Sequence, residues 1–361
     1  MLACLQGISP RAVRALAWRE GSASACLRAI VVGAAGSDND RAYLEATGPI
    51  RIWDDLRMAK ARFAVPGDVD YWPAFTRLAD PPVGVFVRGA ALEPLEQRIA
   101  VVGARRPTVT GREVATAMSL TLAMTGVGVV SGGALGIDAA AHRGALDAAG
   151  RTVAVLGSGI DVLHPRTNAG LFRDLLAGAG TLVSEYPPGV PPEPWRFPAR
   201  NRLIAALSRG VVVVEGRERS GTQITAEHAV DLGLDVFAVP GSVTSPLSAT
   251  PHALIRDGAI LIRDAWDLLE DLGFDPSALP VVTPVGLPDD ERSVLAALVA
   301  PMLPETIARA AGMKTSAAVA ALVRLELRGI VRASAGRYER TLRAVHVDHR
   351  TSGPQRTASA I

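Results

Sequence analysis

Six short runs of apolar, mostly β-branched residues alternate with helix-like segments between Arg98 and Leu272. Continuous apolar strands separated by helices are typical of a parallel sheet that is covered on both faces. Within residues 114–122, apolar side chains recur at helical spacing, which places one helix face against such a sheet. The sequence therefore predicts a doubly wound α/β domain. Its predicted strands are Ile99–Val102, Val127–Val130, Val153–Leu156, Leu182–Val183, Val211–Val214 and Val236–Val239.

The segments that flank this region have different patterns. Residues 1–62 are rich in Ala, Leu and Arg with interrupted helical spacing, which predicts a module of short helices ahead of a domain at 63–274. Residues 275–288 contain four prolines and are predicted to be a linker. Residues 289–342 show three helical segments and two short strands around an Ala-Gly turn, which resembles a winged helix. Residues 343–361 are predicted to be a disordered tail.

Composition narrows the class of protein. Of the 361 residues, 48% are hydrophobic, which fits a globular chain with a substantial core. The formal net charge is only +2, so any basic surface has to be local. Cys4 and Cys26 are too few for a disulfide framework and lack metal-ligand spacing. Because no leader pattern and no apolar run of membrane-spanning length occur, we expect a cytoplasmic protein without membrane contact.

Glycines and hydroxyl-bearing residues follow several of the predicted strands. Because ligands gather outside the carboxyl ends of parallel strands, these loops are expected to form one binding edge. Glycine lets backbone amides approach an anion, and the N-termini of the following helices favour negative charge. Each loop alone could be an ordinary tight turn, but together they predict phosphate binding. The residues concerned are Gly103, Arg105, Ser131, Gly132, Ser220, Gly221 and Thr222.

The segment from Arg196 to Arg202 adds three guanidinium groups, an amide and an aromatic ring, and is predicted to lie just before a helix. Arginine pairs with phosphate, and an aromatic ring is a stacking surface for an unpaired base. This combination favours a single-stranded nucleic acid over a mononucleotide. Phe197 could instead be a core residue, and some of the arginines could bind helix carbonyls. Arg105 and Arg166 also lie beside glycine loops, where solvated surface charge is the alternative.

The sequence motifs for nucleotide-cofactor binding, metal binding and catalysis are weaker than those for phosphate binding. The loop Gly103–Arg105 does not match G-x-G-x-x-G, and no G-x-x-x-x-G-K-[ST] occurs, so no nucleotide cofactor is predicted. Asp138 and His142 lie one helical turn apart without a third ligand, which favours a helix cap and a packed histidine over a metal site. Glu185 and Glu215 end strands with no nucleophile placed beside them. We therefore expect that the protein is not an enzyme.

Two further functions remain as alternatives. The first is a nucleotide phosphoribohydrolase of the lysine-decarboxylase-like (LOG) group, whose Gly-Thr loop has an echo in Gly221-Thr222 and Glu227. The glycines that precede that loop in the group are absent here. The second is a sequence-specific regulator that acts through the winged helix. The first turns of its third helix, Ser316–Ala321, offer almost nothing to a major groove, and Arg324 and Arg328 come late.

Taken together, the motifs resemble those of the DNA-processing protein A family, also called DprA or Smf. The resemblance extends from about residue 65 to residue 265. The first four motifs are Leu78-x-Asp80-Pro81-Pro82, Val101-Val102-Gly103-Ala104-Arg105, Ser131-Gly132-Gly133-Ala134-x-Gly136-Ile137-Asp138-x-x-x-His142 and Ser184-Glu185-Tyr186-Pro187-x-Gly189. The next four are Phe197-Pro198-x-Arg200-Asn201-Arg202, Ser220-Gly221-Thr222-x-Ile224-Thr225, Val236-Phe237-Ala238-Val239-Pro240-Gly241 and Leu254-Ile255-x-x-Gly258-Ala259.

The resemblance implies an extended Rossmann-like fold with an N-terminal helical module and a C-terminal winged-helix-like domain. It implies a homodimer that binds single-stranded DNA without sequence preference and loads the RecA recombinase during natural transformation. It also implies which residues contact the strand. These are Gly103, Arg105, Ser131, Gly132 and Arg166 at the phosphates, Phe197, Arg200, Asn201 and Arg202 along the path, and Ser220, Gly221 and Thr222 as further donors.

Overall fold

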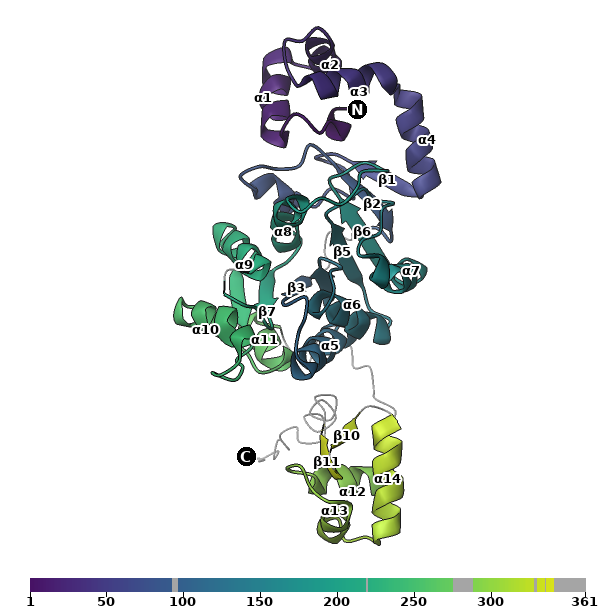
Figure 1. Ribbon diagram of the computed structural model, residues 1–361, viewed down its shortest axis with the longest axis vertical. Coiled ribbons are helices and arrows are strands. Elements are labelled where there is room, and N and C mark those ends of the chain that lie inside the picture. The colour runs from purple at the N-terminus through teal and green to yellow at the C-terminus, as the bar shows by residue number, and fades with distance from the viewer. Residues whose placement is uncertain (93–96, 219, 275–287, 328–329, 335, 341–361) are drawn as a thin grey trace, which may run out of the picture. The chain divides into compact units, whose positions relative to one another are not determined.

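A computed structural model describes residues 1–92, 97–218, 220–274, 288–327, 330–334 and 336–340. The chain divides into two compact units, Met1–Pro280 and Val281–Ile361. The first unit contains an N-terminal group of helices and a large α/β part, as Figure 1 shows. The predicted linker, apart from Pro288, and the predicted tail lie outside the described residues. Within the described part of the chain, no helix has the length and apolar character needed to cross a membrane.

The described residues of the first unit form a nine-stranded sheet with the order β1-β2-β6-β5-β4-β3-β7-β8-β9. The inner and later strands are parallel: Ala100 of β3 lies opposite Val130 of β4 and Val211 of β7. Strand β2 pairs antiparallel with β6, and β1 pairs antiparallel with β2. The strands are β1 Ala61–Ala64, β2 Val85–Gly89, β3 Arg98–Val102, β4 Gly128–Ser131, β5 Thr152–Leu156, β6 Gly180–Ser184, β7 Gly210–Val213, β8 Asp235–Ala238 and β9 Ile260–Leu261.

The six predicted strands are confirmed as β3 to β8, each with ends within two residues of the prediction. These six strands are parallel to one another, as predicted, and β1 and β2, which the sequence did not predict, add an antiparallel pair at one edge. The apolar run in β2, Val85–Val87, is only three residues long. Its partner, Val183 of β6, lies far along the chain, so local sequence carries little signal for this strand.

Helices cover both faces of the sheet, which confirms the doubly wound α/β fold. Ile99 and Val101 of β3 pack with one group of helices, whereas Ala100 and Val102 pack with another. The first group is α5 Val109–Met124, α6 Ile137–Asp147, α7 Ala169–Ala177 and α11 Ala265–Asp271, and the second is α8 Arg196–Ala206 and α9 Gly221–Asp231. The remaining helices of this part are α10 Ala249–Arg256 and the 3-10 turns Pro73–Arg77, Arg166–Asn168 and Pro246–Ser248.

The N-terminal residues form short helices, as predicted. Ser9, Ser22 and Ser37 begin three of them, and each hydroxyl accepts a backbone N–H from the first turn. Leu56 packs in one apolar cluster with Phe86 of β2, which joins these helices to the edge of the sheet. The elements are the 3-10 turn Leu2–Cys4 and helices α1 Pro10–Glu20, α2 Ala23–Val31, α3 Asp38–Ala46 and α4 Pro49–Ala59.

The second unit has the predicted order of three helices and a hairpin around its own apolar core. The outward positions of the third helix include Ser316, Ala317 and Ala320, which carry no charge. Arg324 is engaged by Asp290 and Glu291 of the first helix, so it is not directed to a groove. Arg328 lies outside the described residues. The elements are α12 Asp289–Ala297, α13 Pro304–Ala310, α14 Thr315–Leu327, β10 Val331–Ser334 and β11 Arg337–Arg340.

Candidate nucleic-acid interface

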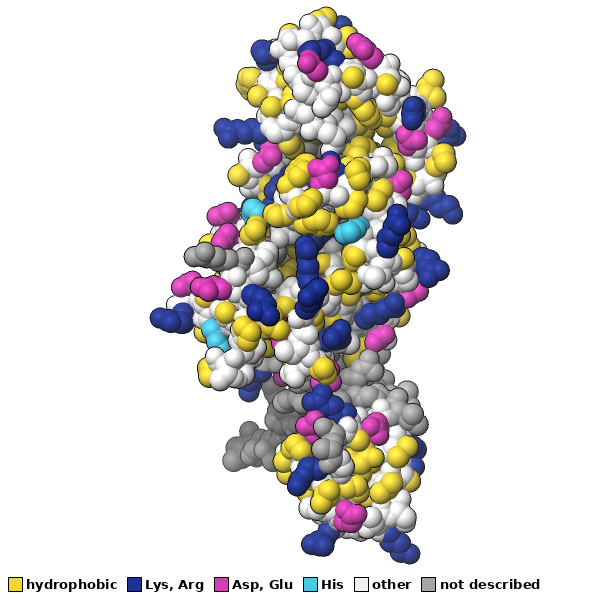
Figure 2. Space-filling view, in the orientation of Figure 1, with side chains coloured by type: hydrophobic (Ala, Val, Ile, Leu, Met, Phe, Trp, Pro, Cys, Tyr) yellow, Lys and Arg dark blue, Asp and Glu magenta, His cyan; other side chains and the backbone are white. Residues whose placement is uncertain are grey.

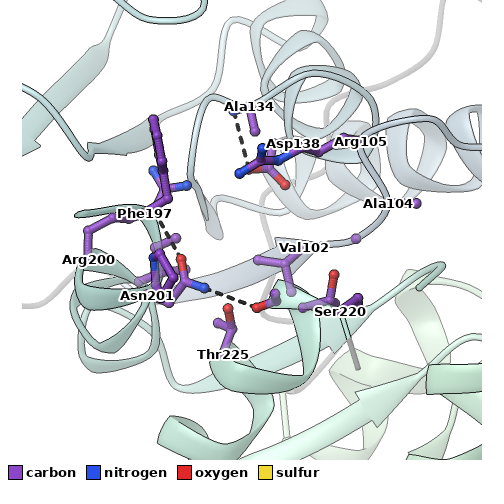
Figure 3. Close-up of a pocket in the computed structure, with 15 residues that line it drawn as sticks. Val102, Ala104, Arg105, Ala134, Asp138, Phe197, Arg200, Asn201, Ser220 and Thr225 are labelled. Carbon is purple, nitrogen blue, oxygen red and sulfur yellow. Dashed lines mark hydrogen bonds between the residues drawn. The ribbon is translucent and has the colours of Figure 1, made fainter. Parts of the chain in front are cut away.

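A cavity of about 240 Å³ lies at the carboxyl ends of β3 and β7. These neighbouring strands lead into helices on opposite faces of the sheet, and such a switch point is where open α/β sheets bind ligands. Figure 3 shows side chains of α8 on one side of the cavity and residues at the start of α9 on another. The described lining is Val102, Gly103, Ala104, Arg105, Ala134, Asp138, Phe197, Pro198, Arg200, Asn201, Ile204, Ser220, Gly221, Thr222 and Thr225.

The cavity brings together eight of the twelve residues proposed from the sequence. These eight are Gly103, Arg105, Phe197, Arg200, Asn201, Ser220, Gly221 and Thr222. The other four, Ser131, Gly132, Arg166 and Arg202, do not line it. Among the lining residues that were not proposed, Ala134 and Asp138 come from the loop and helix that follow β4. The motif that contains them is visible in the sequence, but the position of Ala134 at the cavity depends on the hydrogen bond from its N–H to Asp138.

Close backbone packing explains the glycines around the cavity. A Cβ on Gly103 would lie 2.9 Å from the carbonyl oxygen of Glu215, and one on Gly136 would lie 2.3 Å from that of Ala104. Gly136 also has a φ of 83°, a conformation that favours glycine. The N–H of Ile137 donates to the Ala104 carbonyl across this contact. Packing between the β3 and β4 loops therefore requires small residues even without a ligand.

Arg105 and Phe197 form the exposed rim of the cavity. The guanidinium carbon of Arg105, an exposed side chain, lies 5.5 Å from the centre of the Phe197 ring. The half-buried ring rests against Gly157, where a Cβ would come within 2.9 Å of it. The centre of the His164 ring lies 5.6 Å from the centre of the Phe197 ring. Phe197 is thus held in place while still lining the opening, and Arg105 lies over it as a charge available to a ligand.

The N-terminus of α9 supplies backbone donors to the same cavity. Ser220 is the N-cap residue, yet its side chain makes no capping hydrogen bond and instead lies 3.4 Å from the Thr250 hydroxyl. The first amides of a helix have no partner within the helix, so this end favours an anion. Asn201 donates to the carbonyl of Gly221 at 3.1 Å, which fixes the start of α9 relative to α8.

Arg200 is buried, and its guanidinium is engaged by backbone carbonyls of the fold. Its guanidinium donates to the carbonyls of Gly132, at 2.6 Å, and Val155. A Cβ on Gly132 would lie 2.2 Å from that guanidinium. The hydroxyl of Ser131 donates to the Val101 carbonyl and is fully buried. Ser131 and Gly132, which were proposed at a phosphate, are thus engaged by contacts inside the fold and do not line the cavity.

The carboxylate of Asp138 lies near the charge of Arg200 and accepts hydrogen bonds from the glycine loop after β4. Its Oδ2 accepts the N–H groups of Gly132, at 3.2 Å, and Ala134, at 3.3 Å. Burial raises the pKa of Asp138, and the nearby Arg200 acts in the opposite direction. Asp138 thus organises the loop that precedes its helix, and the N-cap position that the sequence suggested for it belongs to Gly136.

His142 is a packed core histidine, as expected from the sequence. Its Nδ1 lies 2.7 Å from the hydroxyl of Thr152, and its ring is fully buried. Burial, with a smaller effect from Arg200, lowers the pKa of His142 to about 3. The imidazole is therefore neutral at physiological pH.

The arginine-rich segment lies inside α8, which corrects the prediction that it precedes a helix. Because successive residues turn by about 100° in a helix, Arg200 and Asn201 point to the cavity whereas Arg202 points away. Arg202 donates to Glu185 at 2.7 Å on the other side of α8. Arg166 is exposed in a 3-10 turn outside the cavity lining. Neither Arg202 nor Arg166 is therefore part of this cavity.

Both carboxylates considered as catalytic bases have structural partners, and that of Glu185 is Arg202. Glu215 accepts the backbone N–H and the hydroxyl of Thr108, at 2.9 Å and 2.6 Å, and so fixes the start of α5. Glu227, which the phosphoribohydrolase alternative requires, is exposed and does not line the cavity. Among the described lining residues, Asp138 is the one carboxylate, and it is engaged by the loop amides. This geometry fits an anion-binding role better than glycosidic bond cleavage.

The fold and the site define a class: a Rossmann-like α/β protein with a cavity at the switch point of its sheet that is lined by glycine loops, arginine and one aromatic ring. The sequence profile of the family described as DNA recombination-mediator protein A matches residues 62–273, more than half of the chain. A second profile, the DprA winged helix domain, matches residues 278–337. The chain belongs to the DNA recombination-mediator protein A family, as its motifs predicted.

Individual relatives agree with this assignment. The chain is 40% identical to Protein Smf of Escherichia coli over 295 residues, which cover 78% of each chain. It is 42% identical to DNA processing protein DprA of Bacillus subtilis over 54% of this chain and 65% of that one. Among solved structures, DprA of Streptococcus pneumoniae matches with a TM-score of 0.59 and 36% identity, over 65% of this chain and 83% of that one. DNA processing protein A of Helicobacter pylori, described for its single-stranded DNA binding mode, matches with a TM-score of 0.53 and 28% identity, over 59% of this chain and 97% of that one.

Proposed function

We propose that this chain binds single-stranded DNA and acts as a recombination mediator. The observation that carries the proposal is the Arg105–Phe197 pair at the rim of the cavity. A guanidinium suits a backbone phosphate, and a supported aromatic ring offers a stacking surface for an unpaired base. The amides at the start of α9 and the Gly103 loop offer further contacts to phosphate. A strand with repeated phosphates and bases uses all of these features at once.

Surface charge supports the same proposal. On the face shown in Figure 2, Lys and Arg side chains gather over the α/β part of the first unit. Because the formal net charge is only +2, this gathering is a local basic surface and not a property of the whole chain. A local basic surface beside an aromatic stacking position is the usual arrangement for binding single strands without sequence preference.

Membership of a family described as recombination mediators supports the recombination role, and the description of the H. pylori relative supports single-stranded DNA as the ligand. We infer that residues 63–274 are the DNA-binding domain and that the protein works in the cytoplasm as a homodimer. In this proposal it protects incoming single strands and loads RecA onto them during natural transformation. It catalyses no reaction and needs no cofactor, since the cavity serves to hold a phosphate backbone.

Replacing Arg105 by alanine is expected to weaken binding of labelled dT, dC and mixed 20-mers by the same factor, about tenfold at low salt. The reason is that a phosphate contact carries no sequence information. The slope of log affinity against log salt concentration should also become shallower, by about 0.7 for each phosphate of a single strand that the protein no longer neutralises. Fluorescence anisotropy titrations at three salt concentrations measure both quantities.

Arg143→Ala is the matched control, because it removes the same charge from an exposed position that does not line the cavity. It should change affinity by less than about twofold. Binding by the wild-type chain that is independent of salt would contradict the proposal. A loss in Arg105→Ala that is confined to one base composition would contradict the phosphate role of Arg105.

Replacing Phe197 by alanine is expected to cost about 1–3 kcal/mol of binding free energy, because one stacked base loses its platform. The salt slope should stay at the wild-type value, since no charge is removed. Phe197→Tyr keeps the ring and should bind within about twofold of wild type. The same anisotropy titrations test this, and a shallower salt slope in Phe197→Ala would show that the ring acts by holding Arg105 instead.

A further inference from the structure

Trp195 is an exposed aromatic residue at the start of α8. It is the N-cap residue of this helix, and 54% of its surface is exposed. Because α8 follows β6, its first residues lie at the carboxyl edge of the parallel strands, which is also the edge that carries the cavity described above. Tryptophan is highly buried on average in folded proteins, so an exposed one at a binding edge is a candidate contact for the ligand.

Three neighbouring side chains hold the indole ring of Trp195 in place. The guanidinium carbon of Arg196 lies 4.9 Å from the ring centre, and the ring of Tyr186 meets the indole edge-on, with 6.3 Å between the centres. The indole N–H donates to the carboxylate of Glu193. Arg196 is itself buried and donates to the carbonyl of Pro191, so it supports the ring and is not available to a phosphate. Because the ring is already positioned, little conformational entropy is lost when a base stacks on it.

The ring of Trp195 borders open space on the side of α8 that faces away from the first cavity. A second cavity, of about 380 Å³, lies there between the start of α8 and the N-terminal residues 2–10. Trp195 and Ala199 line this second cavity, whereas Phe197 and Asn201 line the first one. The beginning of α8 therefore separates two cavities and contributes one aromatic ring to each.

We propose that Trp195 is a second stacking position for the bound single strand, and that it accepts any of the four bases. The proposal rests on the function proposed above, because the strand is the source of the base. Phe197 lies two residues further along the same helix, and the opposite sides of a helix with its side chains are only about 10–12 Å apart. Proteins that bind single strands stack successive bases on aromatic side chains. A strand that crosses the beginning of α8 can therefore place one base on each ring.

Stacking on Trp195 is expected to be independent of the identity of the base. Every base has a π face, so an aromatic ring does not by itself distinguish one base from another. The indole N–H is engaged by Glu193 and is not offered to the edge of a base. The Glu193 carboxylate also lies 3.7 Å from the Arg196 guanidinium, which offsets its negative charge. Trp195 should therefore add to the affinity without changing the sequence preference or the salt dependence of binding.

Tryptophan fluorescence and anisotropy titrations of the full chain test this inference together. A base that stacks on an indole quenches its emission, so an unlabelled dT 20-mer should quench the fluorescence of the wild-type chain. Trp195→Leu should lose most of this quenching and should bind labelled dT, dC and mixed 20-mers about tenfold more weakly, by the same factor for each. Its salt slope should stay at the wild-type value, since no charge is removed. Trp195→Phe should also lose the quenching, but it keeps a ring and should bind within about threefold of wild type.

Trp53→Leu is the matched control, because Trp53 is 63% exposed in α4 and is not among the described lining residues of either cavity. It should keep the quenching and the affinity of the wild-type chain. Unchanged affinity of Trp195→Leu overturns the second stacking position, as does quenching that survives in both Trp195 variants or a loss of affinity for one base composition alone. Failure of the wild-type chain to bind any of the 20-mers overturns the proposed function instead. Should urea unfolding show that Trp195→Leu is unstable, the quenching measured for Trp195→Phe decides the matter.

Discussion

Replacing Arg200 by methionine is expected to lower the free energy of unfolding of the first unit by about 3–5 kcal/mol, since it leaves a buried charge without its partner. Arg200 is 5% exposed and interacts with the buried Asp138. It also donates to the carbonyls of Gly132 and Val155, which would lose their donor. Burial lowers the pKa of Arg200 to about 10, so the group is still charged at neutral pH. Methionine has a similar length but neither the charge nor the donors.

Urea unfolding followed by tryptophan fluorescence measures this loss in the intact chain. All five tryptophans, Trp18, Trp53, Trp72, Trp195 and Trp266, lie in the first unit, so the signal reports on that unit alone. Adding Asp138→Asn to Arg200→Met should recover part of the stability, because the unpaired charge is then removed. Arg166→Met, at an exposed position, should change stability by less than about 0.5 kcal/mol. A stable Arg200→Met variant that only loses DNA affinity would instead make Arg200 a ligand of the strand.

Arg200 also marks the limit of what the sequence could predict about the site. The glycine loops follow predictable strands, so the sequence alone is enough to expect their assembly at one sheet edge. Which arginine reaches the cavity depends on the rotation of α8, which begins at Arg196. The sequence suggested a loop there, and a loop does not direct nearby side chains to different sides as a helix does. Arg200 and Arg202 were therefore grouped together, although they lie on different sides of the helix and serve different contacts.

The strands of the sheet also divide into those that the sequence predicts and those that it does not. Strands β3 to β8 are runs of apolar residues buried on both faces, and that pattern is local and readable. The antiparallel pair β1 and β2 gains its burial from β6 and from the N-terminal helices, through contacts such as Leu56 with Phe86. Nothing near Val85 in the sequence signals those partners.

We expect that His142 makes the free energy of unfolding decrease as the pH falls below 6.5. Burial lowers the pKa of His142 to about 3 in the folded chain, against an ordinary value of 6.5. Below pH 6.5 the unfolded chain takes up a proton at this residue, whereas the folded chain does not. The stability associated with neutral His142 is therefore fully present above pH 6.5 and is lost as the pH falls toward 3. The loss is about 1.4 kcal/mol per pH unit, or about 3 kcal/mol at pH 4.5.

The comparison of wild type with His142→Gln isolates this effect from other titrations. Burial raises the pKa values of Asp138 and Glu185, and these groups act in the opposite direction, because the folded chain then binds protons more readily. Both groups are present in both proteins, so they cancel to first order in the difference. Tryptophan-detected urea unfolding at pH 7.5, 6.0 and 4.5 should show that the stability advantage of wild type shrinks by about 2–3 kcal/mol over this range. A constant difference would mean that His142 is protonated in the folded chain. The imidazole would then have to form an ion pair, and the neutral hydrogen bond to Thr152 could not be its main interaction.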